Sequence, residues 1–187
     1  AIWLEDTQGN YLSTVYVTHK IATQSWQASG GNRRKEALPH WCYSRGVKYD
    51  DGLYLPTKKE PLIDGISGAT PHESFDIKLN PATALKKFVI KIEINHSTDF
   101  NESFPKSAKD GEANYSGGKE GSGQPAIVYA ANVDLSSGEK SFEANLMGHS
   151  SPDGSSGEVN KDTSGLTTAL HIVKRITVII QIGRAHV

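Results

Sequence analysis

The chain lacks the features that cross-link, anchor or target many proteins of its size. Its single cysteine, Cys42, excludes an internal disulfide bond and, between Trp41 and Tyr43, is predicted to be a small core residue. Twenty Lys and Arg residues nearly balance 21 Asp and Glu residues, so no net field would recruit nucleic acid or an anionic membrane. No apolar run is long enough to span a membrane, and no stretch has the pattern of a signal peptide. We therefore expect no nucleic acid partner and no membrane span in these residues.

The motifs of the common catalytic sites are also missing. There is no Gly-x-Ser-x-Gly elbow, no Cys-x-x-Cys or His-x-x-x-His spacing, and no phosphate-binding loop pattern. His149 lies beside Ser150, Ser151 and Asp153, but a nucleophilic triad depends on geometry as well as on residue type. We predict a protein without catalytic residues. A serine or metal-dependent hydrolase is an alternative, ranked behind the two functions given at the end of this section.

The residues that are present favour β-structure. Eighteen glycines and eight prolines, with few helix-favouring runs, indicate many turns. A hydrophobic share of 36% over 187 residues suits one core, so we predict one domain over residues 1–181. Short β-branched and aromatic runs predict strands at 1–6, 11–19, 75–79, 88–95, 124–135, 141–149 and the end of 166–180. These strands indicate an all-β, antiparallel, immunoglobulin-like sandwich with long decorated loops and little helix.

Two segments carry the details of this prediction. Strand 88–95 alternates apolar residues with Lys91 and Glu93, which predicts one buried and one exposed face. Residues 20–63 lack periodicity and predict a long ordered loop with a helical turn at 33–38. The aromatic residues expected to anchor this loop are Trp41, Tyr43 and Tyr54.

Polar side chains in the loops are candidate ligands for a metal ion. Oxygen-bearing side chains close in sequence suit calcium, with Asp153 and Asp162 as additional ligands. The four candidates are Asn95, Asp99, Asn101 and Glu102. Their spacing lacks the EF-hand pattern, so solvated loop groups are the alternative. The basic residues 33–35 are candidates for binding a phosphate or an acidic partner, and ordinary solvated side chains are the alternative.

The last six residues, IGRAHV, look like one reading frame of a widely used DNA sequencing adapter, ATC GGA AGA GCA CAC GTC. An ordinary exposed basic tail is the alternative. On the first interpretation residues 182–187 are not native, and the natural chain differs after about Gln181.

Several segments, in order along the chain, resemble the bacterial family of predicted periplasmic proteins called domain of unknown function 2271. They are IWLEDTQGNYLSTVYVTHK, RRKEALPHW, DGLYLPTK, DGISGATP, IEIN, GQPAIVYAANVDL, MGHSSPDG and GLTTALHIVKRI. The resemblance implies a secreted β-rich domain, located in the periplasm or at the cell surface. It also implies genes for flavin transferases and PepSY-type membrane proteins nearby, and with them electron transfer or metal-related envelope chemistry.

One of these segments resembles the acceptor motif on which bacterial flavin transferases place FMN. The motif, Asp-x-x-Ser/Thr-Gly-Ala-Thr, is matched by Asp64, Ser67, Gly68, Ala69 and Thr70. In this resemblance the Thr70 hydroxyl would take the FMN phosphate, and the isoalloxazine ring would be the redox centre. An ordered structural turn, closed by Pro71, is the alternative.

Two functions follow from these observations. The first is a non-catalytic exported module that serves as an accessory or binding component of an envelope redox or metal-handling system. The second is a flavin carrier with FMN joined through phosphate to Thr70. A flavin transferase and a PepSY-type membrane protein are the expected partners. The exposure of Thr70 distinguishes the two functions, because a buried and hydrogen-bonded hydroxyl would not be accessible to a transferase.

Overall fold

The computed structural model describes residues 1–26, 33–62, 65–79 and 85–181. The strands in these ranges are β1 (Ile2–Glu5), β2 (Tyr11–Thr18), β3 (Ile66–Gly68), β4 (Lys87–Ile94), β5 (Ile127–Asp134), β6 (Ser141–Glu143), β7 (Asn145–His149) and β8 (Thr177–Ile179). The helices are α1 (His19–Thr23) and α2 (Pro39–Ser44), with 3-10 turns η1 (Gly118–Glu120) and η2 (Thr168–His171). The prediction of a mostly β protein with little helix is confirmed. The predicted non-native tail lies outside the described residues.

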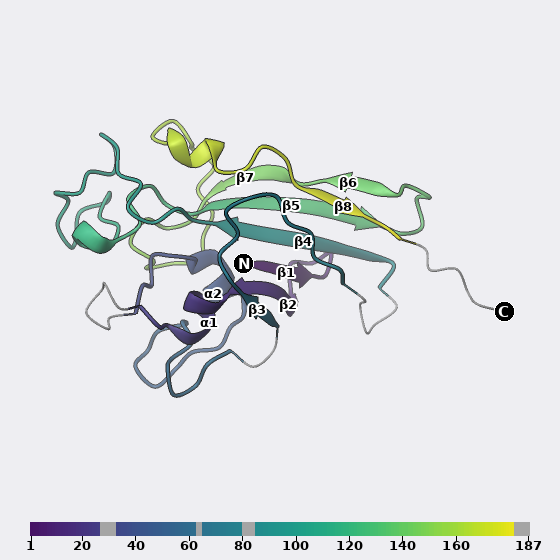
Figure 1. The fold of residues 1–187 in the computed structure, drawn as a ribbon, viewed down its shortest axis with the longest axis horizontal. Coiled ribbons are helices and arrows are strands. Elements are labelled where there is room, and N and C mark those ends of the chain that lie inside the picture. The colour runs from purple at the N-terminus through teal and green to yellow at the C-terminus, as the bar shows by residue number, and fades with distance from the viewer. Residues whose placement is uncertain (27–32, 63–64, 80–84, 182–187) are drawn as a thin grey trace.

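Six strands form one mixed sheet, and β6 and β8 form a separate antiparallel pair (Figure 1). The order in the large sheet is β3-β2-β1-β4-β5-β7, so the short strand β3 lies at one edge. All neighbouring strands of the large sheet pair antiparallel except β2 and β3, which are parallel. The prediction of antiparallel strands is therefore wrong at β3. The long connection through α1 and α2 returns the chain in the same direction, which a parallel pair requires.

The large sheet is covered on both faces. Successive residues of a strand point to opposite faces, and Trp3 and Leu4 accordingly enter two different cores. Trp3 is fully buried with Trp41 of α2. Leu4 packs with Phe88 of β4 and Phe142 of β6. The helices therefore cover one face, and the β6–β8 pair covers part of the other.

The hairpin predicted from the first 19 residues is confirmed. Strands β1 and β2 pair antiparallel, and the Asp6 carboxylate accepts hydrogen bonds from the backbone N–H groups of Gln8 and Asn10 at 2.8 and 2.9 Å. Gly9 has a φ of 86°, in the left-handed region that glycine tolerates. The turn is therefore specified by residues inside it.

Strand β4 is present where the sequence predicts it, but its polar face is not exposed. Glu93 is completely buried, and Lys91 is half-buried 3.9 Å from the carboxylate of Glu5. The prediction of one exposed face is wrong because α2 packs over this side of β4. The alternation of apolar and polar residues cannot distinguish a solvated polar face from one that binds buried backbone donors.

Three local predictions are also wrong. The segment 75–79 forms no strand in the described structure, although Ile77 packs against the core around Leu4. Alternation indicates which side chains are buried, but a strand also needs a partner for its backbone. The helical turn expected at 33–38 lies instead in α2, where Pro39 at the helix start has a preset φ. The strand expected at 141–149 is divided, since β7 pairs with β5 and β6 with β8.

The aromatic anchors of the long loop are confirmed. Trp41 is fully buried, and the rings of Tyr43 and Tyr54 stack with centroids 4.3 Å apart. Cys42 is also buried, and burial raises the pKa of its thiol. It is a core residue, as predicted, and the raised pKa keeps its thiol neutral.

The loop after β7 packs tightly against the segment before α2, and this contact predicts a stability effect. Gly154 is buried with a φ of +71°, and a Cβ there would lie 2.2 Å from the carbonyl oxygen of Lys35. Gly154→Ala is expected to lower the free energy of unfolding by about 2 kcal/mol, because the backbone must move apart.

Gly46 provides the matched control for this substitution. Its φ is +68°, but a Cβ there would meet nothing within 4 Å. Gly46→Ala therefore measures the conformational penalty alone, about 1 kcal/mol. Urea unfolding of both variants checks the prediction, and equal losses of stability would contradict the close contact at Lys35.

Candidate functional site

The flavin-acceptor-like segment forms a strand at the edge of the large sheet. Ile66, Ser67 and Gly68 make up β3 and pair with Tyr16, Val17 and Thr18 of β2 in that order. Asp64, the first residue of the motif, lies outside the described residues. The segment is therefore ordered, but as an edge strand and not as the turn that the sequence also allowed.

Tyr16 holds the backbone immediately before the acceptor residue. Its hydroxyl donates a hydrogen bond to the carbonyl oxygen of Ala69. A Cβ on Gly68 would lie 3.1 Å from both Cε2 and Oη of Tyr16, so a larger residue would push the ring away from the backbone by a few tenths of an ångström. One glycine of the motif thus has a packing role within this chain.

Thr70 follows this anchor and is exposed. Ser67 and Ala69 are exposed as well, and the next residue, Pro71, is half-buried. The Thr70 hydroxyl forms no hydrogen bond with the described part of the chain. The structure therefore presents a hydroxyl that another protein can reach, on a backbone that β2 holds in place.

Sequence reasoning missed Tyr16. The residue lies in a well-predicted strand, but its contact with Ala69 spans 53 positions of the chain. This contact depends on the parallel pairing of β2 with β3, which no pattern within either segment specifies. The only signal in the sequence itself was an aromatic residue within a predicted strand.

The four calcium candidates lie just after β4, in the connection to β5. Asn95, Asp99 and Asn101 use side-chain oxygens to accept hydrogen bonds from the protein, and Glu102 is exposed. The donors are Ser122 Oγ to Asn95, Gln124 Nε2 and Thr168 Oγ1 to Asp99, and the N–H of Phe104 to Asn101. Within the described ranges, no three or more His, Cys, Asp or Glu side chains are grouped to hold a metal ion.

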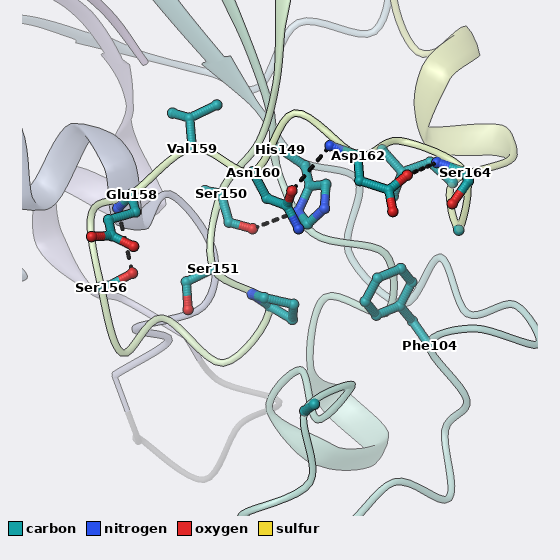
Figure 2. A pocket seen from close by; sticks show the side chains of 14 residues that line it. Phe104, His149, Ser150, Ser151, Ser156, Glu158, Val159, Asn160, Asp162 and Ser164 are labelled. Carbon is teal, nitrogen blue, oxygen red and sulfur yellow. Dashed lines mark hydrogen bonds between the residues drawn. The ribbon is translucent and has the colours of Figure 1, made fainter.

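A polar cavity of about 690 Å³ opens beside the end of β7 and contains His149, Ser150 and Ser151 (Figure 2). The Ser150 hydroxyl donates to a backbone carbonyl at 3.2 Å, and the Ser151 hydroxyl donates to Asp153 at 2.6 Å. His149 Nδ1 lies 2.8 Å from the carbonyl oxygen of Ser150. Neither hydroxyl is therefore bonded to the imidazole, and the geometry does not assemble a Ser-His-Asp triad.

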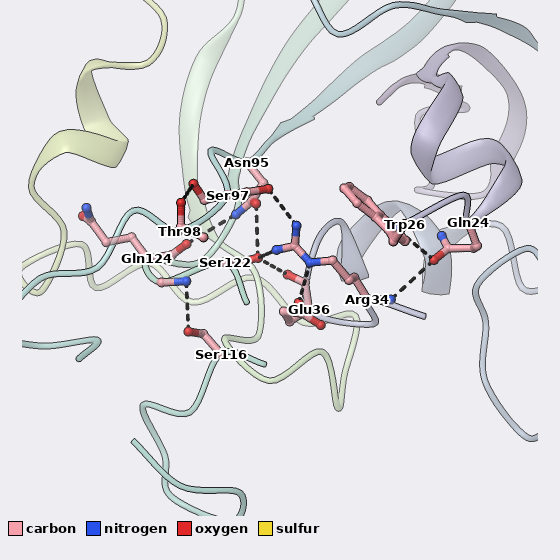
Figure 3. Close-up of polar contacts among 11 residues, drawn as sticks. Gln24, Trp26, Arg34, Glu36, Asn95, Ser97, Thr98, Ser116, Ser122 and Gln124 are labelled. Carbon is pink, nitrogen blue, oxygen red and sulfur yellow. Dashed lines mark hydrogen bonds and ion pairs between the residues drawn. The ribbon is translucent and has the colours of Figure 1, made fainter. Parts of the chain in front are cut away.

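The two arginines of the basic cluster before α2 are used inside the protein. Arg34 is buried, and its guanidinium donates to Glu36 at 2.9 Å, Ser97 at 2.7 Å and Ser122 at 3.1 Å (Figure 3). Arg33 forms an ion pair with Asp51 and donates to a carbonyl of the same long loop. Both guanidinium groups therefore hold loops together, and neither is free to bind an external phosphate.

No helix in the described ranges is long and apolar enough to cross a membrane. Comparisons with models of protein families, with curated proteins and with solved structures identify no match to this chain.

Proposed function

We propose that this protein is a non-catalytic exported module of an envelope redox system, in which it carries FMN joined through phosphate to Thr70. The observation that supports this function is the exposed Thr70 hydroxyl, which has no hydrogen-bond partner in the described residues. The resemblance to domain of unknown function 2271 supplies the periplasmic or cell-surface location and the partners, a flavin transferase and a PepSY-type membrane protein. The packing of β6 and β8 over one sheet face supports the assignment of an immunoglobulin-like sandwich.

Attachment of FMN requires a flavin dinucleotide donor, in which a pyrophosphate joins FMN to AMP. Thr70 Oγ1 attacks the FMN phosphorus, an oxygen–phosphorus bond forms, the pyrophosphate linkage breaks and AMP leaves. The hydroxyl proton passes to a base of the transferase. The residues of this chain present the hydroxyl, since Tyr16 holds the carbonyl of Ala69 and the residues just before Thr70 are small. The attached flavin supplies redox chemistry that side chains lack.

The redox role is favoured over the metal-handling role for a structural reason. Three of the four residues proposed for calcium use side-chain oxygens to accept hydrogen bonds from protein donors, so an ion would compete with those bonds. The Thr70 hydroxyl would lose no such bond on modification.

The function is tested by co-expressing the chain with a flavin transferase and measuring the intact mass. We expect the wild-type chain to gain one FMN per molecule, and Thr70→Ala to gain none. Thr70→Ser should keep the modification, because it keeps the hydroxyl. Since Thr70 is exposed, Thr70→Ala should change the free energy of unfolding by less than about 0.5 kcal/mol.

Thr7 offers the matched control, because it is an exposed threonine in the turn between β1 and β2. Thr7→Ala should be modified as fully as the wild type. An unmodified wild-type chain, or FMN retained in Thr70→Ala, would reject the proposed function.

A further inference from the structure

Two exposed apolar side chains and a half-buried tyrosine form a patch beside the acceptor residue. They are Tyr16 of β2, Ile66 of β3 and Phe75, which we call the Tyr16 patch. Ile66 is 58% exposed and Phe75 is 49% exposed. The rings of Tyr16 and Phe75 lie with centroids 5.6 Å apart and planes inclined by 48°. Two aromatic faces are thus held together at the edge of the sheet.

This patch is unusual for its position in the sheet. Edge strands commonly carry charged residues or proline that discourage unwanted contacts, whereas β3 carries the most exposed side chain of this patch, Ile66. Tyr16 lies directly opposite Ile66 in the ladder, so their side chains are neighbours on one face. Neighbouring exposed apolar side chains are favourable places for an apolar ring to pack, because contact removes them from water.

The patch is joined directly to the acceptor segment. The hydroxyl of Tyr16 is bonded to the carbonyl oxygen of Ala69, and Thr70 is the next residue. The Tyr16 ring also lies against Gly68, where a Cβ would come within 3.1 Å of it. A group attached to Thr70 therefore starts one residue from the aromatic pair.

We infer that Tyr16 and Phe75 form the surface on which the isoalloxazine ring of the FMN at Thr70 rests, an inference that depends on the proposed function. A flat aromatic ring system packs favourably against aromatic side chains in offset or edge-on arrangements. Resting there would bury the exposed faces of the Tyr16 patch and remove one face of the flavin from water. The two side chains would thus position a cofactor that is covalently held only through its phosphate.

The test uses the flavinylated protein and the fluorescence lifetime of its flavin. A phenol in contact with an excited flavin quenches its emission by electron transfer, and the electron then returns. The wild type should show a large short-lived component from flavin resting on Tyr16. In Phe75→Ala the ratio of short-lived to long-lived flavin should fall by about two- to tenfold, the range that follows from aromatic pair energies.

Two further variants make the result specific. Tyr16→Phe keeps a ring but removes the phenol, so the long-lived component should dominate in the chains that carry FMN by intact mass. Leu146→Ala removes an apolar side chain that is 44% exposed on β7, at the opposite edge of the sheet, and should leave the lifetimes unchanged.

Each outcome decides between the two proposals. If FMN is attached at Thr70 but Phe75→Ala and the wild type have the same lifetimes, the ring-binding surface is rejected and the carrier function stands. An equal change in Leu146→Ala would also reject the surface. If the wild type acquires no FMN by intact mass, the carrier function fails and the ring-binding surface fails with it.

Discussion

Arg34→Ala is expected to lower the free energy of unfolding by about 3–5 kcal/mol, the cost of removing one partner from a buried ion pair. The side chains of Arg34 and Glu36 are each only 6% exposed, and their atoms Nε and Oε1 lie 2.9 Å apart. Without the guanidinium, the Glu36 carboxylate would remain buried with no opposite charge beside it. The hydroxyls of Ser97 and Ser122 would each lose a donor as well.

Arg34 contacts segments that are distant in sequence, so removing its side chain should destabilise more than one loop. Its three acceptors belong to segments that are up to 88 residues away in sequence, and its guanidinium also lies 4.8 Å from the ring of Trp26. These contacts tie the loop before α2 to the long polar excursion between β4 and β5 (Figure 3). A lysine has one ammonium group in place of the planar fork, so Arg34→Lys should recover only part of the stability.

Chemical denaturation with a solvent-exposed control measures this effect. Lys87 and Asp134 form an ion pair at the same distance, 2.9 Å, but the Lys87 side chain is 61% exposed. Lys87→Ala should therefore lower the stability far less than Arg34→Ala, since water screens and replaces the exposed pair. Similar losses in the two variants would contradict a buried structural role for Arg34.

Glu93→Ala is expected to destabilise the protein by about 3 kcal/mol, because two backbone donors lose a buried acceptor. The Glu93 carboxylate is fully buried and accepts the N–H groups of His40 and Trp41 at 3.1 and 2.7 Å. These N–H groups lie in the first turn of α2, where no other helix carbonyl is available to them. The strand β4 thus provides the cap that the helix lacks in its own sequence.

Glu93 should also make the stability depend on pH. Burial raises the pKa of the Glu93 carboxyl above its ordinary value of 4.5, against the opposing effects of His40 and the N–H of Trp41. The folded state therefore binds this proton more tightly than the unfolded state. The part of the Glu93 contribution that comes from binding this proton is complete below pH 4.5 and is lost as the pH rises through the raised pKa. The hydrogen bonds that Glu93 accepts from His40 and Trp41 are a separate contribution.

Glu93→Gln isolates this contribution, because glutamine does not titrate at this position. The free energy of unfolding of the wild type minus that of Glu93→Gln should fall as the pH rises from below 4.5, and should level off above the raised pKa. Urea unfolding of both proteins across this range gives the difference directly. A difference that grows with pH would show that the folded state favours the ionised carboxylate.

Much of the β-structure could be predicted from the sequence because it depends on neighbouring residues. The hairpin follows from Asp6 and Gly9 in its turn, and β4 and β5 follow from their apolar runs. The segment 75–79 has the same apolar alternation but forms no strand, since nothing in the described chain pairs with its backbone. Alternation predicts burial, and strand formation additionally depends on a distant partner.

The candidate site also has a part that the sequence predicts and a part that depends on distant pairing. The residues of the acceptor-like motif are visible in the sequence, and their small size indicates a backbone that other molecules can approach. Their placement at the sheet edge is not visible there, because it depends on β3 pairing in parallel with β2. The exposed hydroxyl of Thr70 and the aromatic pair beside it both follow from this pairing.

The sequence by itself determined the β-rich class, the hairpin and the identity of the residues around Thr70. Only the tertiary structure decided that Glu93 is buried as a cap for α2, and that Tyr16 lies against the acceptor segment. The physical reason is the range of the interactions. Turn geometry and side-chain alternation act over a few residues, whereas ladder partners and buried polar contacts join residues more than 50 positions apart.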